Sequence, residues 1–343
     1  MSNLLLILGN GFSIDFISQI GKESAIDVIN LFRLGHTVKF PETNTSGFLS
    51  YKHCPNLWLL GAHPNKSECM SIIEEIITCS NMLFDYMAFT GPNNDRMRFV
   101  DKENQSIYIQ AYSELIAYLR HLFIHYDSRI TAGDINAFLK KTWGWKSFFE
   151  KAKNKYKNIK IVTYNYDIWL ERILDTLNIE YSIGGFEPCD KSFCIIKPHG
   201  SISFVPEKDP KAMYEIKYTI DSWDEDISKL KVEYTELEQY DKNFLIPPAG
   251  DSSRQQINGW SKTLRECAID AAKSIGKSDD VIICGMSYWH VDRKELDELF
   301  INLNHDVNIT LINPDPPKDL NAVLVTLFRN YKVFTSSESL KEE

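Results

Sequence analysis

Short runs of consecutive apolar residues recur along the chain and predict strands that are buried on both faces. The first run, residues 4–8, is followed by Gly-Asn-Gly and then by apolar residues at helical spacing. Strands that alternate with helices in this way predict an α/β fold, a Rossmann-like doubly wound parallel sheet. The runs expected to form its strands are residues 4–8, 159–163, 194–197, 281–284, 307–312 and 331–334.

A different pattern separates the first strand and helix from the later strands. Residues 41–64 are rich in Asn, Thr, Ser, Gly and Pro, which is typical of a loop, whereas residues 71–145 place apolar side chains mostly at helical spacing. We therefore expect residues 1–40 and 151–343 to form the sheet domain. Residues 41–150 are expected to form a mainly helical insertion.

The charge balance argues against nucleic acid as a direct partner. The 343 residues include 38 basic and 47 acidic side chains, a net charge of −9, which repels a polyanion. The lysine-rich run at residues 151–160 is interpreted as a solvated helix face leading into a strand. No apolar stretch is long enough to span a membrane, and the N-terminal apolar run is too short for a signal peptide. We expect a cytoplasmic protein.

Cysteine and histidine spacing predicts neither a disulfide framework nor a metal site. The seven cysteines contain no C-x-x-C pair, a pattern typical of a reducing compartment. His121 and His125 have the i, i+4 spacing of helical metal ligands, but no glutamate lies between them. We interpret both histidines as structural.

Polar and glycine-rich segments follow the predicted strands. In a doubly wound sheet, ligands bind beyond the carboxyl ends of the strands, so these segments are expected to line one crevice. Asn165 and His199 are 34 residues apart, about the length of one βαβ unit. The segments are residues 9–13, 165–167, 199–201, 285–287 and 313–315.

Each segment also has a purely structural interpretation. The Gly9-Asn10-Gly11 turn allows close approach of a pyrophosphate, but a tight turn alone also requires such glycines. Asn165 and Asp167 could cap a helix. His199, between Pro198 and Gly200, is favoured as functional, since histidine titrates near neutral pH.

Taken together, the segments resemble the sirtuin-like family, specifically the bacterial sirtuin-like domains that hydrolyse NAD in antiphage defence. The similarity covers roughly residues 1–20 and 155–320, with the segments in the family's order. The matching segments are residues 8–13, 163–167, 197–201, 282–288 and 312–314.

The resemblance implies a role for each candidate residue. Asn165 is expected to contact the nicotinamide ribose and position a water, His199 to act as general base, and Asp167 to support the nicotinamide-side pocket. The residues expected to bind the phosphates are Gly9, Asn10, Gly11, Phe12 and Ser13, and those expected to hold the adenosine half are Gly285, Ser287 and Asn313.

The sequence departs from the protein-deacylating sirtuins, because it lacks their four-cysteine zinc ribbon, and Pro198 replaces the apolar residue that usually precedes His-Gly. The expectation is therefore an NAD+ hydrolase that binds NAD as substrate, uses no metal, and depletes cellular NAD during abortive infection. Two alternatives stay open: a non-catalytic sensor or scaffold that binds NAD or ADP-ribose, and NAD-dependent ADP-ribosyl transfer or deacylation. NADP also stays open as the substrate.

An unregulated NAD hydrolase would kill its host, and little of the chain is left over for a sensor domain. We expect control by a separate activator protein, such as a nucleotide-pyrophosphatase-like subunit, by a signal nucleotide, or by assembly into a homo- or hetero-oligomer.

Overall fold

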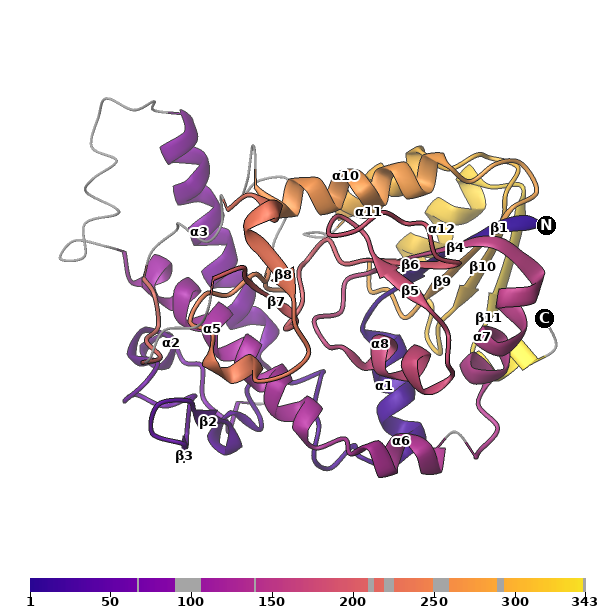
Figure 1. Cartoon of the computed structure of the whole chain (residues 1–343). Helices are drawn as coiled ribbons and strands as arrows, with labels where there is room; N and C mark the ends of the chain where they lie inside the picture. The colour runs from indigo at the N-terminus through magenta and orange to yellow at the C-terminus, as the bar shows by residue number, and fades with distance from the viewer. Residues whose placement is uncertain are drawn as a thin grey trace. The chain divides into compact units, whose positions relative to one another are not determined.

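Seven parallel strands form the central sheet, in the order β11-β10-β9-β1-β4-β6-β5 (Figure 1). This computed structural model describes residues 1–66, 68–89, 106–138, 140–208, 213–218, 225–248, 259–288 and 293–341. The Rossmann-like α/β fold predicted from the apolar runs is confirmed. The strands are β1 (Ser2–Leu8), β4 (Tyr156–Thr163), β5 (Tyr181–Ile183), β6 (Phe193–Ile196), β9 (Asp280–Cys284), β10 (Asn308–Ile312) and β11 (Asn330–Phe334).

The chain adds strands on one side of β1 and then crosses to the other side. From β1 it passes to the neighbouring β4 and on to β5 and β6, and it returns at β9 against the opposite edge of β1. The reversal places the topological switch point at β1, where doubly wound sheets bind ligands. The pairing is in register: Leu8 lies opposite Thr163 and Cys284, and Cys284 lies opposite Ile312. The segments that follow these strands therefore begin at the same edge.

Helices cover both faces of the sheet (Figure 1). Alternate residues of β1, such as Leu5 and Ile7, belong to a buried apolar cluster with residues of α10, α11 and α12. On the other face, Phe12 of α1 packs against three aromatic residues. Two of them, Trp145 and Phe149, belong to α7, and Trp143 directly precedes it. The helices around the sheet are α1 (Asn10–Ile20), α6 (Ala132–Phe138), α7 (Gly144–Lys155), α8 (Trp169–Thr176), α10 (Trp260–Lys273), α11 (Arg293–Ile301) and α12 (Lys318–Leu327), followed by the short η4 (Ser337–Lys341).

The chain divides into two compact units. The sheet unit contains residues 1–24, 130–198 and 263–343, and the second unit contains residues 25–129 and 199–262. The sequence pattern groups residues 199–262 with the sheet, but these residues pack with the helical segment. The second unit consists of η1 (Gly35–Thr37), β2 (Lys39–Phe40), β3 (Thr45–Ser46), α2 (Pro55–Leu59), α3 (Met70–Phe89), α5 (Ile107–Ser128), β7 (Phe204–Pro206), η2 (Ile227–Lys229), β8 (Leu230–Val232) and η3 (Leu237–Gln239).

Within the second unit, helix α5 is the central element. Its residues from Ala111 to Leu122 are almost all buried, including charged Glu114 and Arg120. The Glu114 carboxylate accepts hydrogen bonds from the backbone and side chain of Asn56, from Leu57 N and from the Tyr218 hydroxyl. Burial of a charge is tolerated when it is fully hydrogen-bonded in this way.

A disulfide joins Cys189 to Cys194, with the two Cα atoms 5.4 Å apart. The cysteine spacing, interpreted as typical of a reducing compartment without a disulfide framework, did not predict this pair. The reason is local: the segment between β5 and β6 doubles back, so that an exposed loop cysteine lies beside the second residue of β6. The remaining five cysteines are free thiols.

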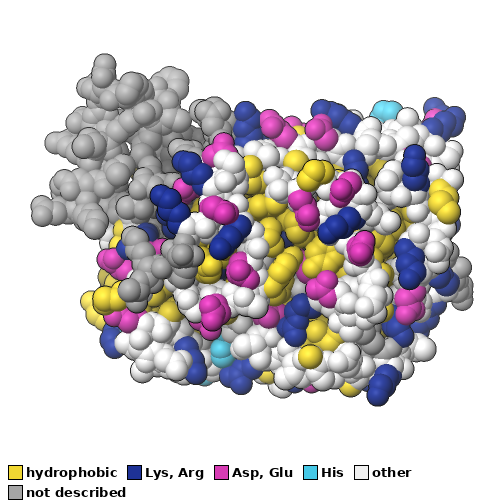
Figure 2. All heavy atoms as spheres, viewed as in Figure 1, with side chains coloured by type: hydrophobic (Ala, Val, Ile, Leu, Met, Phe, Trp, Pro, Cys, Tyr) yellow, Lys and Arg dark blue, Asp and Glu magenta, His cyan; other side chains and the backbone are white. Residues whose placement is uncertain are grey.

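On the face shown in Figure 2, Lys and Arg side chains are interspersed with Asp and Glu among the described residues. The lysine-rich run lies on the end of α7 and the start of β4, where Lys153, Lys155 and Lys157 are exposed, as interpreted from the sequence. No helix in the described part of the chain is both long and apolar enough to cross a membrane.

Candidate active site

The glycine turn after β1 packs directly against the turn after β9. Gly9 N donates to Cys284 O (2.9 Å) and Gly11 N donates to Gly285 O (3.2 Å). A Cβ atom on Gly11 would lie 2.4 Å from the Gly285 Cα, and Gly285 itself has φ +63°. Close backbone approach therefore requires glycine at both positions, whether or not a phosphate also binds there.

Asn165 extends from the β4 end toward this glycine turn. Its side-chain Nδ2 donates to the Gly9 carbonyl (3.0 Å) and to the Ser13 Oγ (2.9 Å). Because a backbone carbonyl can only accept, the first bond fixes which end of the amide faces the turn. The residue is partly exposed, and among the described residues Oδ1 has no hydrogen-bond partner. Asn165 thus presents a fixed carbonyl oxygen at the switch point of the sheet.

Asp167 belongs to the same hydrogen-bond network. The Ser13 hydroxyl donates to Asp167 Oδ2 (2.6 Å), and Trp169 N donates to Oδ1 (3.1 Å) at the start of α8. Burial raises the pKa of Asp167 to about 6, while Lys197 and these hydrogen bonds oppose the rise. Asp167 is therefore mostly ionised at neutral pH and accepts from Ser13. The structure brings Gly9, Ser13, Asn165 and Asp167 together.

A buried ion pair contacts the backbone of Asp167. Lys197 Nζ is 2.8 Å from Glu171 Oε1, and each side chain is 1 % exposed. The same Nζ donates to the backbone carbonyl of Asp167 (2.5 Å). Sequence reasoning assigned neither residue a role. The available signals were a lysine directly after an apolar strand and a carboxylate four residues after Asp167.

The residues expected to hold the adenosine half also lie at the carboxyl edge of the sheet. Asn313 Nδ2 donates to Met286 O (3.2 Å) and its Oδ1 accepts from Asp315 N (3.1 Å), so it links the turns after β9 and β10. Ser287, two residues after Gly285, is exposed. That these residues hold the adenosine half stays a prediction.

Phe12 differs from the other residues of the predicted phosphate-binding turn. Its side chain is 1 % exposed and lies 5.4 Å from Trp145 and 5.9 Å from Trp143, measured between ring centroids. Only the backbone of Phe12 is left to contact a ligand, whereas the neighbouring Asn10 side chain is exposed.

His199 belongs to the second unit, so its pairing with Asn165 stays a prediction. Within that unit its carbonyl accepts from Ile246 N (2.9 Å), and Gly200 forms an isolated antiparallel bridge with Leu245. Helix α5 supports the same segment, because Arg120 donates to Ile202 O (3.3 Å). The histidine is 4 % exposed, which distinguishes it from a solvated surface residue.

His121 and His125 each have a polar contact within the second unit. His121 is buried with Nδ1 2.9 Å from Ala117 O, and burial lowers its pKa to about 3. His125 lies 3.3 Å from Thr37 Oγ1. Within the described ranges, no group of three or more His, Cys, Asp or Glu side chains is placed to hold a metal ion.

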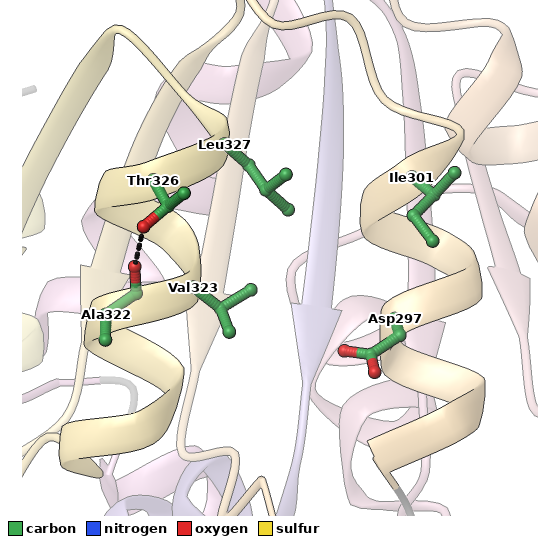
Figure 3. Close-up of a pocket in the computed structure, with 6 residues that line it drawn as sticks. All are labelled: Asp297, Ile301, Ala322, Val323, Thr326 and Leu327. Atoms are coloured by element: carbon green, nitrogen blue, oxygen red, sulfur yellow. Dashed lines mark hydrogen bonds between the residues drawn. The ribbon is translucent and has the colours of Figure 1, made fainter.

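An apolar groove of about 370 Å³ lies between α11 and α12 (Figure 3). Ile301 from one helix and Val323 and Leu327 from the other point toward it, with Asp297 at the α11 side. The Asp297 carboxylate already accepts from the Tyr288 hydroxyl. The groove contains none of the residues predicted from the strand ends, and we do not assign it a role.

Comparison with known protein families finds no family that matches this sequence, and comparison with curated proteins finds no significant relative.

Proposed function

We propose that the chain is an NAD+ hydrolase that releases nicotinamide and ADP-ribose. The observation that carries the proposal is the network of Ser13, Asn165 and Asp167 at the switch point, which leaves the Asn165 carbonyl oxygen as an oriented acceptor. The sheet edge is where a doubly wound fold binds nucleotides. The resemblance of the glycine, Asn-x-Asp and His-Gly segments, in this order, to the sirtuin-like family supports NAD over other nucleotides.

The reaction is a glycoside hydrolysis. The bond between nicotinamide N1 and ribose C1′ breaks, and its electron pair goes to the nicotinamide ring, so C1′ acquires oxocarbenium character. A water oxygen then bonds to C1′ and loses a proton, which gives ADP-ribose, nicotinamide and H⁺. The enzyme must orient the ribose and one water, because correct placement of reactants lowers the barrier.

In this scheme the Asn165 carbonyl oxygen accepts a hydrogen bond from the attacking water or a ribose hydroxyl. His199 takes the water proton, in the role that the resemblance implies. The backbone of the Gly9–Gly11 turn and the start of α1 face the phosphates, because a helix N-terminus favours anions. Gly285, Ser287 and Asn313 hold the adenosine half.

The test measures, by chromatography, the nicotinamide that the purified chain releases from NAD. Asn165→Ala and His199→Ala should abolish release while the circular dichroism spectrum stays unchanged. Asn158→Ala is the matched control, since Asn158 is exposed on the same strand, β4. Wild-type rates in both active-site variants would overturn the proposal. NAD binding without release would favour the non-catalytic sensor or scaffold.

We also propose the cellular role that the resemblance implies, depletion of NAD in antiphage defence under the control of a partner or signal nucleotide. Expression with the neighbouring genes followed by size-exclusion chromatography tests the control step. Full activity of the isolated monomer would contradict it. Parallel assays with NADP decide which dinucleotide is the substrate.

A further inference from the structure

Lys197 and Glu171 form an ion pair that lies fully inside the sheet unit. Lys197 directly follows β6, Glu171 lies in the first turn of α8, and the two charged groups are 2.8 Å apart. Removing two charges from water is costly, and a buried pair of this kind adds little stability compared with apolar residues. Its presence beside the candidate site therefore calls for a reason other than stability.

The pair contacts the candidate network directly. Lys197 Nζ donates both to Glu171 and to the backbone carbonyl of Asp167, so it ties the segment after β4 to the end of β6. The second carboxylate oxygen of Glu171, Oε2, has no hydrogen-bond partner among the described residues. One of the two Lys197 hydrogen bonds thus reaches the backbone of Asp167, whose carboxylate accepts from Ser13.

The charge of Asp167 determines the direction of the hydrogen bonds above it. An ionised carboxylate can only accept, so Ser13 must donate its single proton to Asp167 and use a lone pair to accept from Asn165. If Asp167 were protonated, it could donate to Ser13, and the Ser13 hydroxyl would be free to turn toward another acceptor. The charged and polar groups that face the Asp167 carboxylate are Lys197, Glu171, the Ser13 hydroxyl and the Trp169 N–H.

We infer that the buried Lys197–Glu171 pair is a positioning pair for Asn165: through the carbonyl and the charge of Asp167, it fixes the direction of the Ser13 and Asn165 hydrogen bonds and keeps the Asn165 carbonyl oxygen facing the substrate. The inference rests on the proposed NAD hydrolysis for its catalytic consequence. The effect on Asp167 itself does not depend on any activity.

The experiment uses the double variant Lys197→Met/Glu171→Gln, which removes both charges and keeps similar volumes. The single variant Lys197→Met would leave a lone buried carboxylate and serves only as a comparison. Lys191→Met is the matched control, since Lys191 also donates to a backbone carbonyl, that of Tyr181, but is exposed.

The first readout is the ionisation of Asp167, measured without substrate. The unfolding free energy of each protein is compared with that of its Asp167→Asn derivative between pH 4 and pH 8. Lys197 opposes the rise in the pKa of Asp167 more than Glu171 adds to it. In the double variant, the pH range over which this difference in unfolding free energy changes should therefore extend to higher pH. The same pH range in the double variant and in the wild type would overturn the inference.

The second readout is the pH profile of nicotinamide release. In the double variant the acid limb of the profile, where the rate falls as the pH is lowered, should move to higher pH. At a pH below the limb, kcat should fall about tenfold for every pH unit by which the limb moves, and KM should change less. Lys191→Met should keep the wild-type profile. A double variant that loses activity equally at every pH, or none at all, would overturn the positioning role. If the wild type releases no nicotinamide even when it is expressed with its neighbouring genes, the proposed function fails, and the first readout still decides the inference.

Discussion

Ser13 and Asp167 are joined by a 2.6 Å hydrogen bond although 154 residues separate them in the chain. The bond connects the first helix to the segment after β4, and Asn165 completes the contact by donating to Ser13. A serine hydroxyl placed between an acid and an amide in this way orients the amide, because one proton and one lone pair are both used.

Replacing Ser13 with alanine should impair both stability and turnover. Asp167 would keep only the Trp169 N–H donor, and Asn165 Nδ2 would keep only the Gly9 carbonyl. Loss of a buried hydrogen bond to a charged group costs about 1–3 kcal/mol. Urea denaturation should show a fall of this size in the unfolding free energy. The control is Ser18→Ala, on the exposed face of α1, which should unfold as the wild type does. Equal stability of Ser13→Ala and wild type would contradict the buried network.

The stability of the protein should depend on pH through Asp167. Its pKa rises from the ordinary value of 3.8 to about 6 in the folded chain, so the folded state binds the proton more tightly than the unfolded state. The contribution of this group is therefore most favourable below pH 4 and is lost as the pH rises through 6. The loss is about 3 kcal/mol relative to Asp167→Asn.

The measurement is the unfolding free energy of wild type and Asp167→Asn from pH 4 to pH 7.5. As the pH rises through 6, the wild type should lose stability relative to the variant, because the variant has no carboxyl group to ionise at this position. Parallel curves over the whole range would show that burial does not perturb this carboxyl.

Gly11→Ala should disrupt the contact between the turns after β1 and β9. The new Cβ would lie 2.4 Å from the Gly285 Cα, a backbone atom that cannot move without displacing β9. We expect a loss of roughly 1–3 kcal/mol or more, measured by thermal unfolding. Gly276→Ala is the matched control, because its Cβ would come no closer than 3.6 Å to Asp279 Oδ2. An unchanged melting temperature for Gly11→Ala would contradict the observed packing.

The Cys189–Cys194 disulfide should be detectable by thiol counting. Of the seven cysteines, five should react in denaturant without reductant, and all should react after reduction. Because the bridge closes a short loop, Cys189→Ser should lower the unfolding free energy by only about 2 kcal/mol. Seven reactive thiols in the unreduced protein would show that the bridge does not form.

Much of the sheet could be predicted, because its strands are continuous apolar runs whose ends are marked by glycine or Asn. In-register pairing then brought Gly9, Asn165 and Asn313 to one edge, as expected for a parallel sheet. Strand β5, residues Tyr181–Ile183, was missed, since three residues give no apolar pattern. The burial of the Phe12 side chain could not be predicted, because the aromatic residues that it contacts lie more than a hundred residues away.

The parts that could not be predicted depend on contacts between distant segments. Residues 199–262 pack with residues 25–129, although their sequence continues from a strand of the sheet. The Lys197–Glu171 pair likewise joins a strand end to a helix. A lysine after an apolar strand and a glutamate in the next helix are visible in the sequence, but those signals do not tell a buried charge from a solvated one.

Asn165→Asp is the sharpest test of the amide, because the two side chains have nearly the same shape. Asn165 Nδ2 donates to Gly9 O and Ser13 Oγ, and a carboxylate oxygen at that place could donate to neither. Ser13 would then have two carboxylates competing for its single proton, and the added charge next to Asp167 would favour protonation of one of them.

We expect nicotinamide release by Asn165→Asp to fall by about 100-fold or more, the scale seen when an oriented polar group is removed from an active site. The fall should appear in kcat more than in KM, since the proposed contacts to the phosphates and the adenosine come from other segments. Asn158→Asp introduces the same charge at the exposed beginning of β4 and should keep the wild-type rate. If Asn165→Asp instead retains more than about a tenth of that rate, the orientation of the amide is not required for catalysis, and a role in binding alone would have to replace it.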